Sequence, residues 1–238
     1  MSVAADGNLL RNPGFEDTPN PAQGQGLMPS EWVSLNQTPD TYSNDGSYGL
    51  PPEAADNFTG TLAHGGIRWI AAWSAAFEIP AQLLTSPLTP GETYRLSAYL
   101  HQANRIDLAF PGAFEIRLGN AGRVGDAIAV GTWAPTETED EWEYRSLEFV
   151  APESASELPY LMLVPYAANL GSAYPGIDDI ELVQFSCAAD LNGDGQVDGA
   201  DLGALLGAWG ADGAADFDGS GTVDGADLGV LLAAWGPC

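Results

Sequence analysis

The stretch TYRLSAYLH, residues 93–101, alternates between apolar and polar side chains. Successive side chains of an extended chain point to opposite faces, so this alternation is typical of a β-strand with one buried face. The buried face would carry Tyr94, Leu96, Ala98 and Leu100, and the other face Arg95, Ser97, Tyr99 and His101. Residues 93–101 therefore predict a strand that contributes one face to a core.

Other short runs with strand character surround this stretch. They are AFEIRLG (113–119), EWEYRSLEFVAP (141–152), LPYLMLVPYA (158–167) and GIDDIELVQF (176–185). Turn signals such as Pro90-Gly91 and Pro111-Gly112 separate the runs. Many short strands with no convincing helix among them predict a mainly β fold, a β-sandwich, over residues 7–185.

Both ends of this region resemble a known fold family. NLLRNPGFED (8–17), PLTPGETYRLSAYL (87–100) and GIDDIELVQ (176–184) resemble strands of galactose-binding-like jelly rolls, including carbohydrate-binding modules of the family 4/9/22 type. The resemblance implies a jelly-roll β-sandwich and carbohydrate as a ligand. It also implies a structural Ca²⁺ where the first and last strands meet, with Glu16 and Asp178 as ligands. The alternative is that both are exposed carboxylates at strand ends.

A sugar-binding surface needs aromatic rings to stack on the sugar and polar groups to bind its hydroxyls. We expect a strand beside residues 93–101 to add its polar face to theirs. The candidate ligand-binding residues are Tyr99, His101, Glu115, Arg117, Trp69 and Trp73. The alternative is that Trp69 and Trp73 belong to the core and that Arg117 pairs with a carboxylate.

The chain ends with a duplicated segment, DLNGDGQVDGADLGALLGAWG (190–210) and DFDGSGTVDGADLGVLLAAWG (216–236). Each copy places oxygen-bearing residues at positions 1, 3, 5, 7, 9 and 12 of a loop, with Gly195 or Gly221 at the sharp turn, a spacing typical of Ca²⁺ loops. The predicted ligands are Asp190, Asn192, Asp194, Gln196, Asp198 and Asp201 in the first loop, and Asp216, Asp218, Ser220, Thr222, Asp224 and Asp227 in the second.

A helix with an apolar stripe is predicted after each loop. The stripes are Leu202, Leu205, Leu206 and Trp209, then Leu228, Leu231, Leu232 and Trp235. Each glycine in these helices costs about 1 kcal/mol. We therefore expect residues 187–238 to fold only with their metal.

The duplicated segment resembles a type I dockerin, because each calcium loop ends in Asp and is followed by one helix. VDGADLGxLLxAWG and the final GPC are similar to dockerin-like tails of secreted planctomycete-type bacterial proteins. The resemblance implies a calcium-dependent module that docks onto a partner or anchor. Gly199-Ala200 and Gly225-Ala226 depart from the polar pair with which dockerins recognise cohesin, so a purely structural calcium clasp is the alternative.

Cys187 and Cys238 bracket this segment, which favours a disulfide between them and an oxidising compartment, with two free buried thiols as the alternative. The first residues lack the charged-then-apolar pattern of a secretion signal. The protein is then either intracellular or secreted with its signal already removed, and the expected disulfide favours secretion.

Composition limits the classes of partner. The 238 residues include 33 Asp and Glu against seven Arg and no Lys, a net charge of −26. Such a charge argues against nucleic acid and anionic membranes as partners. No run approaches the roughly 20 apolar residues that span a bilayer, and the common catalytic motifs are missing from the sequence.

We therefore expect a secreted, non-catalytic protein. Its sandwich would bind carbohydrate or another extracellular protein, and its calcium-dependent tail would dock or anchor it. The alternative is a structural subunit that self-associates through sandwich and tail into a surface layer or filament.

Overall fold

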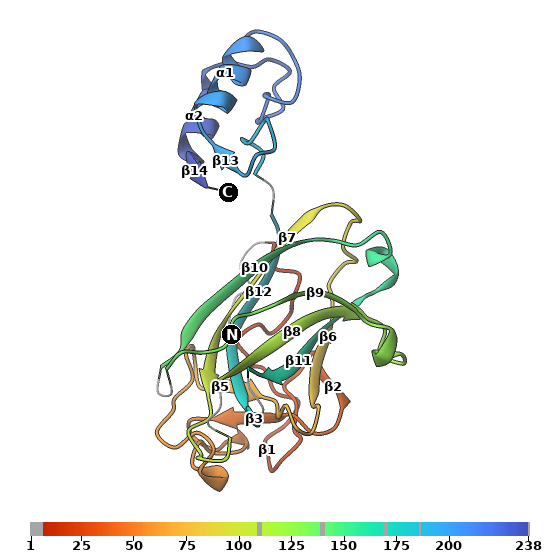
Figure 1. The fold of residues 1–238 in the computed structure, drawn as a ribbon, viewed down its shortest axis with the longest axis vertical. Coiled ribbons are helices and arrows are strands. Elements are labelled where there is room, and N and C mark those ends of the chain that lie inside the picture. The colour runs from red at the N-terminus through yellow and green to blue at the C-terminus, as the bar shows by residue number, and fades with distance from the viewer. Residues whose placement is uncertain (1–6, 109–110, 139–140, 169–170, 186, 238) are drawn as a thin grey trace. The chain divides into compact units, whose positions relative to one another are not determined.

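A computed structural model describes residues 7–108, 111–138, 141–168, 171–185 and 187–237 (Figure 1). The chain divides into two compact units, Met1–Gln184 and Phe185–Cys238. Neither of the helices in the described residues has the length and hydropathy of a membrane-spanning segment.

The first unit is built from two five-stranded antiparallel sheets, and the predicted mainly β sandwich is confirmed. The β7 sheet has the order β10 (Glu143–Val150), β7 (Thr93–Gln102), β12 (Pro175–Gln184), β5 (Arg68–Ala71) and β3 (Asp40–Ser43). The β8 sheet has the order β2 (Trp32–Asn36), β6 (Ile79–Leu83), β11 (Tyr160–Ala167), β8 (Gly112–Gly119) and β9 (Ile128–Thr132). A small parallel pair, β1 (Ala22–Gln23) and β4 (Tyr48–Gly49), and three 3-10 turns at Ala54–Asp56, Val124–Asp126 and Ala155–Glu157 complete this unit.

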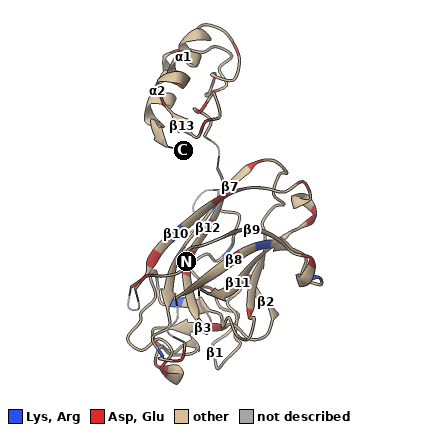
Figure 2. Cartoon of the chain, in the orientation of Figure 1, with Lys and Arg blue, Asp and Glu red and all other residues tan. Residues whose placement is uncertain are grey.

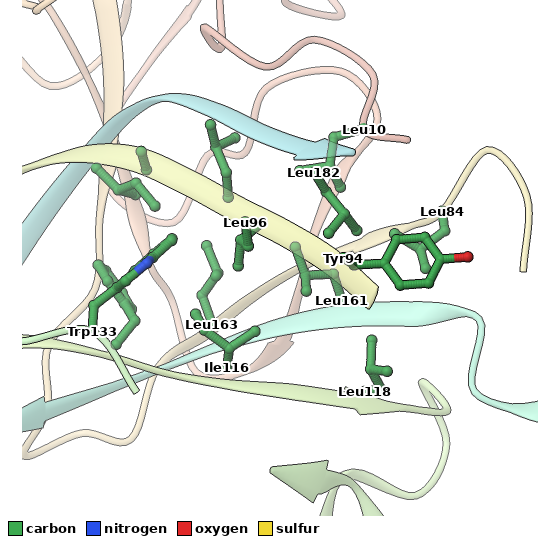
Figure 3. Close-up of a cluster of buried hydrophobic side chains, with 14 of the residues drawn as sticks. Leu10, Leu84, Tyr94, Leu96, Ile116, Leu118, Trp133, Leu161, Leu163 and Leu182 are labelled. Carbon is green, nitrogen blue, oxygen red and sulfur yellow. The ribbon is translucent and has the colours of Figure 1, made fainter. Parts of the chain in front are cut away.

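The main core lies between the two sheets, as Figure 3 shows. The predicted inner face of β7 is confirmed, because Tyr94, Leu96, Ala98 and Leu100 are all buried. Leu96 meets Ile116 of β8 and Leu163 of β11 in one cluster. Burying a side chain of this size contributes about 1.5–3 kcal/mol, so alternate residues of three central strands hold the sheets together.

A second apolar cluster covers part of the outer face of the β7 sheet. Ile70 of β5 points into the main core, so its neighbour Trp69 points outward, where it stacks on Tyr42 with ring centroids 5.4 Å apart. Phe58, from the segment between β4 and β5, packs edge-on against both rings. Loop segments therefore cover this part of the outer face of the β7 sheet, although the sequence predicts a polar face that is open to ligands.

The second unit contains β13 (Gln196–Val197), α1 (Gly199–Gly207), α2 (Gly225–Ala233) and β14 (Gly236–Pro237), with β13 and β14 antiparallel. Each predicted loop is followed by a helix, and Leu205 and Leu231 are fully buried in one cluster. Half of each expected stripe is not core, however. Leu206, Trp209, Leu232 and Trp235 are about half exposed, because helices of nine residues joined to short loops bury one narrow line of side chains.

Candidate functional site

A cavity of about 360 Å³ opens at the β3 edge of the β7 sheet. Loop and strand-end segments line it: Asp40 begins β3, Trp73 and Glu78 lie between β5 and β6, and Tyr174 precedes β12. Asp40, Glu78 and Tyr174 are less than 10% exposed, whereas Trp73 is 40% exposed. We call this cavity the Trp73 pocket. It has a buried polar base and an aromatic ring at its opening.

Two carboxylates lie in the base of the Trp73 pocket. Asp40 accepts hydrogen bonds from the backbone N–H of Gly26 at 2.7 Å and from the Tyr174 hydroxyl at 2.6 Å. Glu78 accepts one from the backbone N–H of Trp73 at 2.6 Å. Burial raises the pKa of Asp40, and burial together with the charge of Asp40 raises the pKa of Glu78 to about 7. The two groups therefore share a site that favours a proton or a cation.

An amide completes the base of the pocket. Asn57 donates from Nδ2 to the Tyr42 hydroxyl at 2.9 Å, while its Oδ1 is buried without a hydrogen-bond partner. Burial raises the pKa of Tyr42 to about 12, so the hydroxyl keeps its proton. A buried acceptor without a partner costs about 1–3 kcal/mol unless a ligand or water supplies a donor.

Trp73 and Arg105 stand toward the opening. The indole N–H of Trp73 donates to the Ser172 hydroxyl, which fixes the ring. The Arg105 guanidinium donates to both oxygens of Asp107, with Nη2 at 2.9 Å from Oδ2. Trp73 therefore presents a fixed ring, and the charge of Arg105 is matched by its neighbour.

The predicted sugar-binding patch does not exist as one surface. Tyr99 and His101 lie on β7, whereas Glu115 and Arg117 lie on β8, and these strands belong to different sheets. The neighbours of β7 are β10 and β12, since the strands that follow each other in sequence here cross between sheets. The expectation that β8 extends the polar face of β7 is therefore wrong.

Two of the six candidates are also covered. Trp69 has no exposed surface, because Tyr42 and Phe58 enclose it. His101 is 2% exposed and contacts the rings of Phe58 and Trp142. The alternative prediction, that Trp69 is a core residue, is confirmed, and Trp73 is the tryptophan of RWIAAWS that lines a cavity.

Glu115 and Arg117 line a second cavity of about 360 Å³ on the β8 sheet, beside Phe77 and Tyr166. The Arg117 guanidinium donates to Glu115, as the alternative for this residue predicts. The charges of Arg117 and Glu115 in this second cavity thus neutralise each other.

Tyr99 lies in a third environment. Its ring stacks on His64 with centroids 3.5 Å apart, and His64 Nδ1 lies 2.7 Å from Asp179 Oδ2. Tyr99 therefore contacts side chains of its own unit, and it lines a further cavity of about 270 Å³ together with Tyr144 and Asp179.

Glu16 and Asp178 converge on the segment 65–68. Glu16 Oε1 accepts the backbone N–H groups of Ile67 and Arg68, both at 2.8 Å, and Asp178 Oδ2 accepts that of Gly65 at 3.0 Å. Asp178 is fully buried, so the alternative that it is an exposed carboxylate is wrong. Burial, followed by the charges of Asp179 and Glu16, raises its pKa well above the usual range. A buried carboxylate among others fits a cation site chemically, although Arg68 already lies beside Glu16.

The second loop of the tail gathers three carboxylates. Oxygens of Asp216, Asp218 and Asp227 lie within 4.8 Å of one another. Calcium ligands lie about 2.3–2.6 Å from the ion, so oxygens on opposite sides of one ion lie about 4.6–5.2 Å apart. The spacing of these three carboxylates is therefore one that a single ion can bridge. The Ser220 hydroxyl also lies 3.2 Å from the Thr222 carbonyl, so two further predicted ligand groups are neighbours. These residues fit Ca²⁺.

The first loop repeats this design with different residues at the third, fifth and seventh positions. Asp201 and Asp227 occupy equivalent places, each fully buried and each accepting three backbone N–H groups. Hydrogen bonds from the backbone, that of Asp198 first, lower the pKa of Asp201, and those of the second loop lower the pKa of Asp227. Asn192 replaces an acidic residue at the third position, and its Nδ2 donates to Asp194 at 2.9 Å.

Asp198 and Asp224 have a second role that the loop spacing does not reveal. Each is the N-cap of the following helix and accepts a backbone N–H, from Ala200 at 2.7 Å and from Ala226 at 2.8 Å. Gly195 and Gly221 take positive φ values of 87° and 89° at the predicted turn, a conformation that favours glycine. The predicted calcium loop and the helix start are thus one structure.

The predicted disulfide involves a residue outside those that the structure describes, Cys238. Cys187 packs against the core of the second unit. Pairing of Gln196 with Pro237 brings the end of the chain beside the first loop. The pairing of the two cysteines stays a prediction.

Sequence reasoning missed Asp40, Asn57, Glu78 and Tyr174 as members of a site. They come from four distant segments and form no motif. A weak signal is an acidic residue directly before an apolar run, as in EIPAQL at Glu78. Only the meeting of loop segments at the sheet edge joins them.

No family model matches the sequence, and no curated protein matches it. Several solved structures are similar in fold, some of them carbohydrate-binding modules. TmCBM61 in complex with β-1,4-galactotriose is 17% identical, with a TM-score of 0.41 over 75% of this chain and 99% of that chain. The CBM22-1 xylan-binding domain of Paenibacillus barcinonensis Xyn10C is 15% identical, with a TM-score of 0.45 over 77% and 97%. A cyclase from Fischerella sp. TAU is 14% identical, with a TM-score of 0.48 over 75% and 97%. What the Trp73 pocket can bind is therefore argued from its own side chains and not from these similar structures.

Proposed function

We propose that this chain is a secreted, non-catalytic binding protein whose sandwich holds carbohydrate in the Trp73 pocket. The observation that carries this proposal is an exposed, fixed indole beside buried polar groups. A sugar ring has apolar C–H faces that stack on an aromatic ring and hydroxyls that pair with polar groups. Trp73 supplies the first kind of contact, and Asp40, Asn57 and Glu78 supply the second.

Trp73→Ala tests this function. Losing the ring should weaken binding to the best ligand of a glycan array about tenfold or more, since an aromatic contact contributes about 1.5 kcal/mol or more. Trp209→Ala, which removes a similarly exposed tryptophan from the tail, is the control and should bind as the parent does. Binding that survives Trp73→Ala but is lost with Arg117→Ala would move the ligand to the cavity on the β8 sheet.

The tail is proposed to bind two Ca²⁺ ions and to dock or anchor the protein in the manner of a dockerin. Support for the ions comes from the oxygen groups gathered in the second loop and from the same ligand spacing in the first loop. Support for docking comes from the apolar surface that the tail leaves exposed at Leu206, Trp209, Leu232 and Trp235. A third Ca²⁺ beside Asp178 and Glu16 is part of the same proposal, because it would neutralise a buried carboxylate.

A disulfide between Cys187 and Cys238 and an extracellular location belong to this proposal as well. Removing the bridge from a unit this small would cost about 2–5 kcal/mol.

The alternative is a structural subunit of a surface layer or filament, and the exposed apolar groups of the tail favour it equally. Light scattering separates the two: polymers that form only with calcium and bind no glycan indicate the structural subunit. A chain that stays monomeric with calcium while binding glycan indicates attachment.

A further inference from the structure

The base of the Trp73 pocket offers acceptors where a ligand would need to offer donors. Asp40 and Glu78 are carboxylates, and Asn57, whose Oδ1 is buried without a hydrogen-bond partner, lines the same cavity. The Tyr174 hydroxyl already donates to Asp40, and the Asn57 amide nitrogen already donates to Tyr42. The most buried lining groups are thus hydrogen-bond acceptors, and a ligand that binds them must supply donors.

The charge of the base is also unmatched. Among the described lining residues, Arg105 is the only cationic side chain, and Asp107 binds its guanidinium through two nitrogens. Asp40 and Glu78 are each less than 10% exposed, so water screens them weakly. The protein as a whole adds a net charge of −26, which repels anionic ligands and attracts cationic ones.

We propose that the Trp73 pocket selects a sugar that carries a protonated primary amine. Its ammonium would occupy the base between Asp40 and Glu78, and its ring would lie against Trp73. An ammonium group offers three donors and one positive charge, which matches both deficits of the base. A cavity of about 360 Å³ suits a group the size of one sugar ring. This inference rests on the proposed function and narrows its ligand class.

Ligand binding is then coupled to protons. Three groups lie near Glu78. The charge of Asp40 raises the pKa of Glu78 further, and the hydroxyls of Tyr42 and Tyr174 stay neutral. The Arg105 guanidinium is already paired with Asp107. With a pKa of about 7, Glu78 holds a proton part of the time at neutral pH. A bound ammonium stabilises the ionised carboxylate, so a ligand whose amine is already fully protonated, such as cyclohexylamine, should release a fraction of one proton at pH 7. A neutral sugar should release less.

Calorimetric titration of the full chain with four probes tests the inference. The probes are a β-1,4-linked glucosamine tetramer, its fully N-acetylated form, the unsubstituted glucose tetramer, and cyclohexylamine as an amine without a sugar. The glucosamine tetramer should bind at least about tenfold more tightly than either neutral tetramer, since a hydrogen bond between charged groups is stronger than one between neutral groups. Glu78→Gln keeps the shape and should remove most of this preference.

Glu115→Gln is the matched control, because it changes a carboxylate in the other cavity, and it should leave all affinities unchanged. Equal binding of the three tetramers, abolished by Trp73→Ala, would overturn the amine inference and keep the proposed function. If cyclohexylamine binds tightly and none of the three tetramers binds, the pocket is an amine site and the proposal that it holds a sugar is overturned. No binding of any probe or array glycan would overturn both.

Discussion

The pKa of a buried carboxylate in this protein depends on what its oxygens contact. In the sandwich, burial raises the pKa of Glu78 and of Asp178, because few donors replace the lost water. In the tail, backbone N–H groups lower the pKa of Asp201 and Asp227, although neither side chain is exposed. The tail aspartates are therefore held ionised, as a cation site needs, while Glu78 is held ready to take up or release a proton.

Glu78 should make the sandwich less stable as the pH rises. Its pKa is 4.5 when unperturbed and about 7 in the folded protein, so the folded state binds more protons between these values. The free energy of unfolding therefore falls as the pH rises from 4.5 to 7, by about 1–3 kcal/mol after allowing for water in the open pocket. Urea unfolding at pH 5 and pH 8, at fixed calcium, should show this fall in the parent and less of it in Glu78→Gln. An identical pH dependence in the two proteins would contradict the raised pKa.

The two short helices depend on their first and middle residues. Asp198 and Asp224 cap α1 and α2 with the full capping box, and a cap of this kind contributes about 1 kcal/mol. Leu205 and Leu231 supply the buried contact. Because each helix has only nine residues, cap and contact together must outweigh a nucleation cost that an isolated helix of this length would not overcome.

Leu205→Ala and Leu206→Ala should destabilise the tail to different degrees, because one leucine of α1 is buried and the other is exposed. Leu205 is fully buried and Leu206 is 52% exposed. Leu205→Ala should destabilise the tail by about 2–4 kcal/mol, and Leu206→Ala by no more than about 0.5 kcal/mol. Thermal loss of the helical circular dichroism signal in calcium measures both. Equal losses would mean that the whole stripe is core, as the sequence alone predicts.

Across the whole molecule, charge is distributed unevenly between the two units. Residues 187–238 carry nine aspartates and no basic side chain, as the lack of blue in Figure 2 illustrates. Such a unit repels itself unless cations bind it. Its calcium loops are therefore expected to decide whether the tail is folded at all.

Chelation should unfold the tail and leave the sandwich largely folded. Excess chelator should remove the helical circular dichroism signal, since both helices lie in residues 199–233, and added calcium should restore it. Asp201→Ala should abolish one calcium equivalent and Asp227→Ala the other in a calorimetric titration. A helical signal that persists in excess chelator would refute metal-coupled folding.

The sequence by itself determined the elements whose causes are local. The alternation at Tyr94–Leu100 fixes which face of β7 is buried, and the loop spacing from Asp190 and from Asp216 fixes where the oxygens and the helix starts fall. Only the tertiary structure decided which strands are neighbours, and so it separated Tyr99 from Arg117. It also covered Trp69, and it joined Asp40, Asn57 and Glu78 beside Trp73. Those outcomes depend on contacts between residues far apart in the chain, which leave no period or spacing in the sequence.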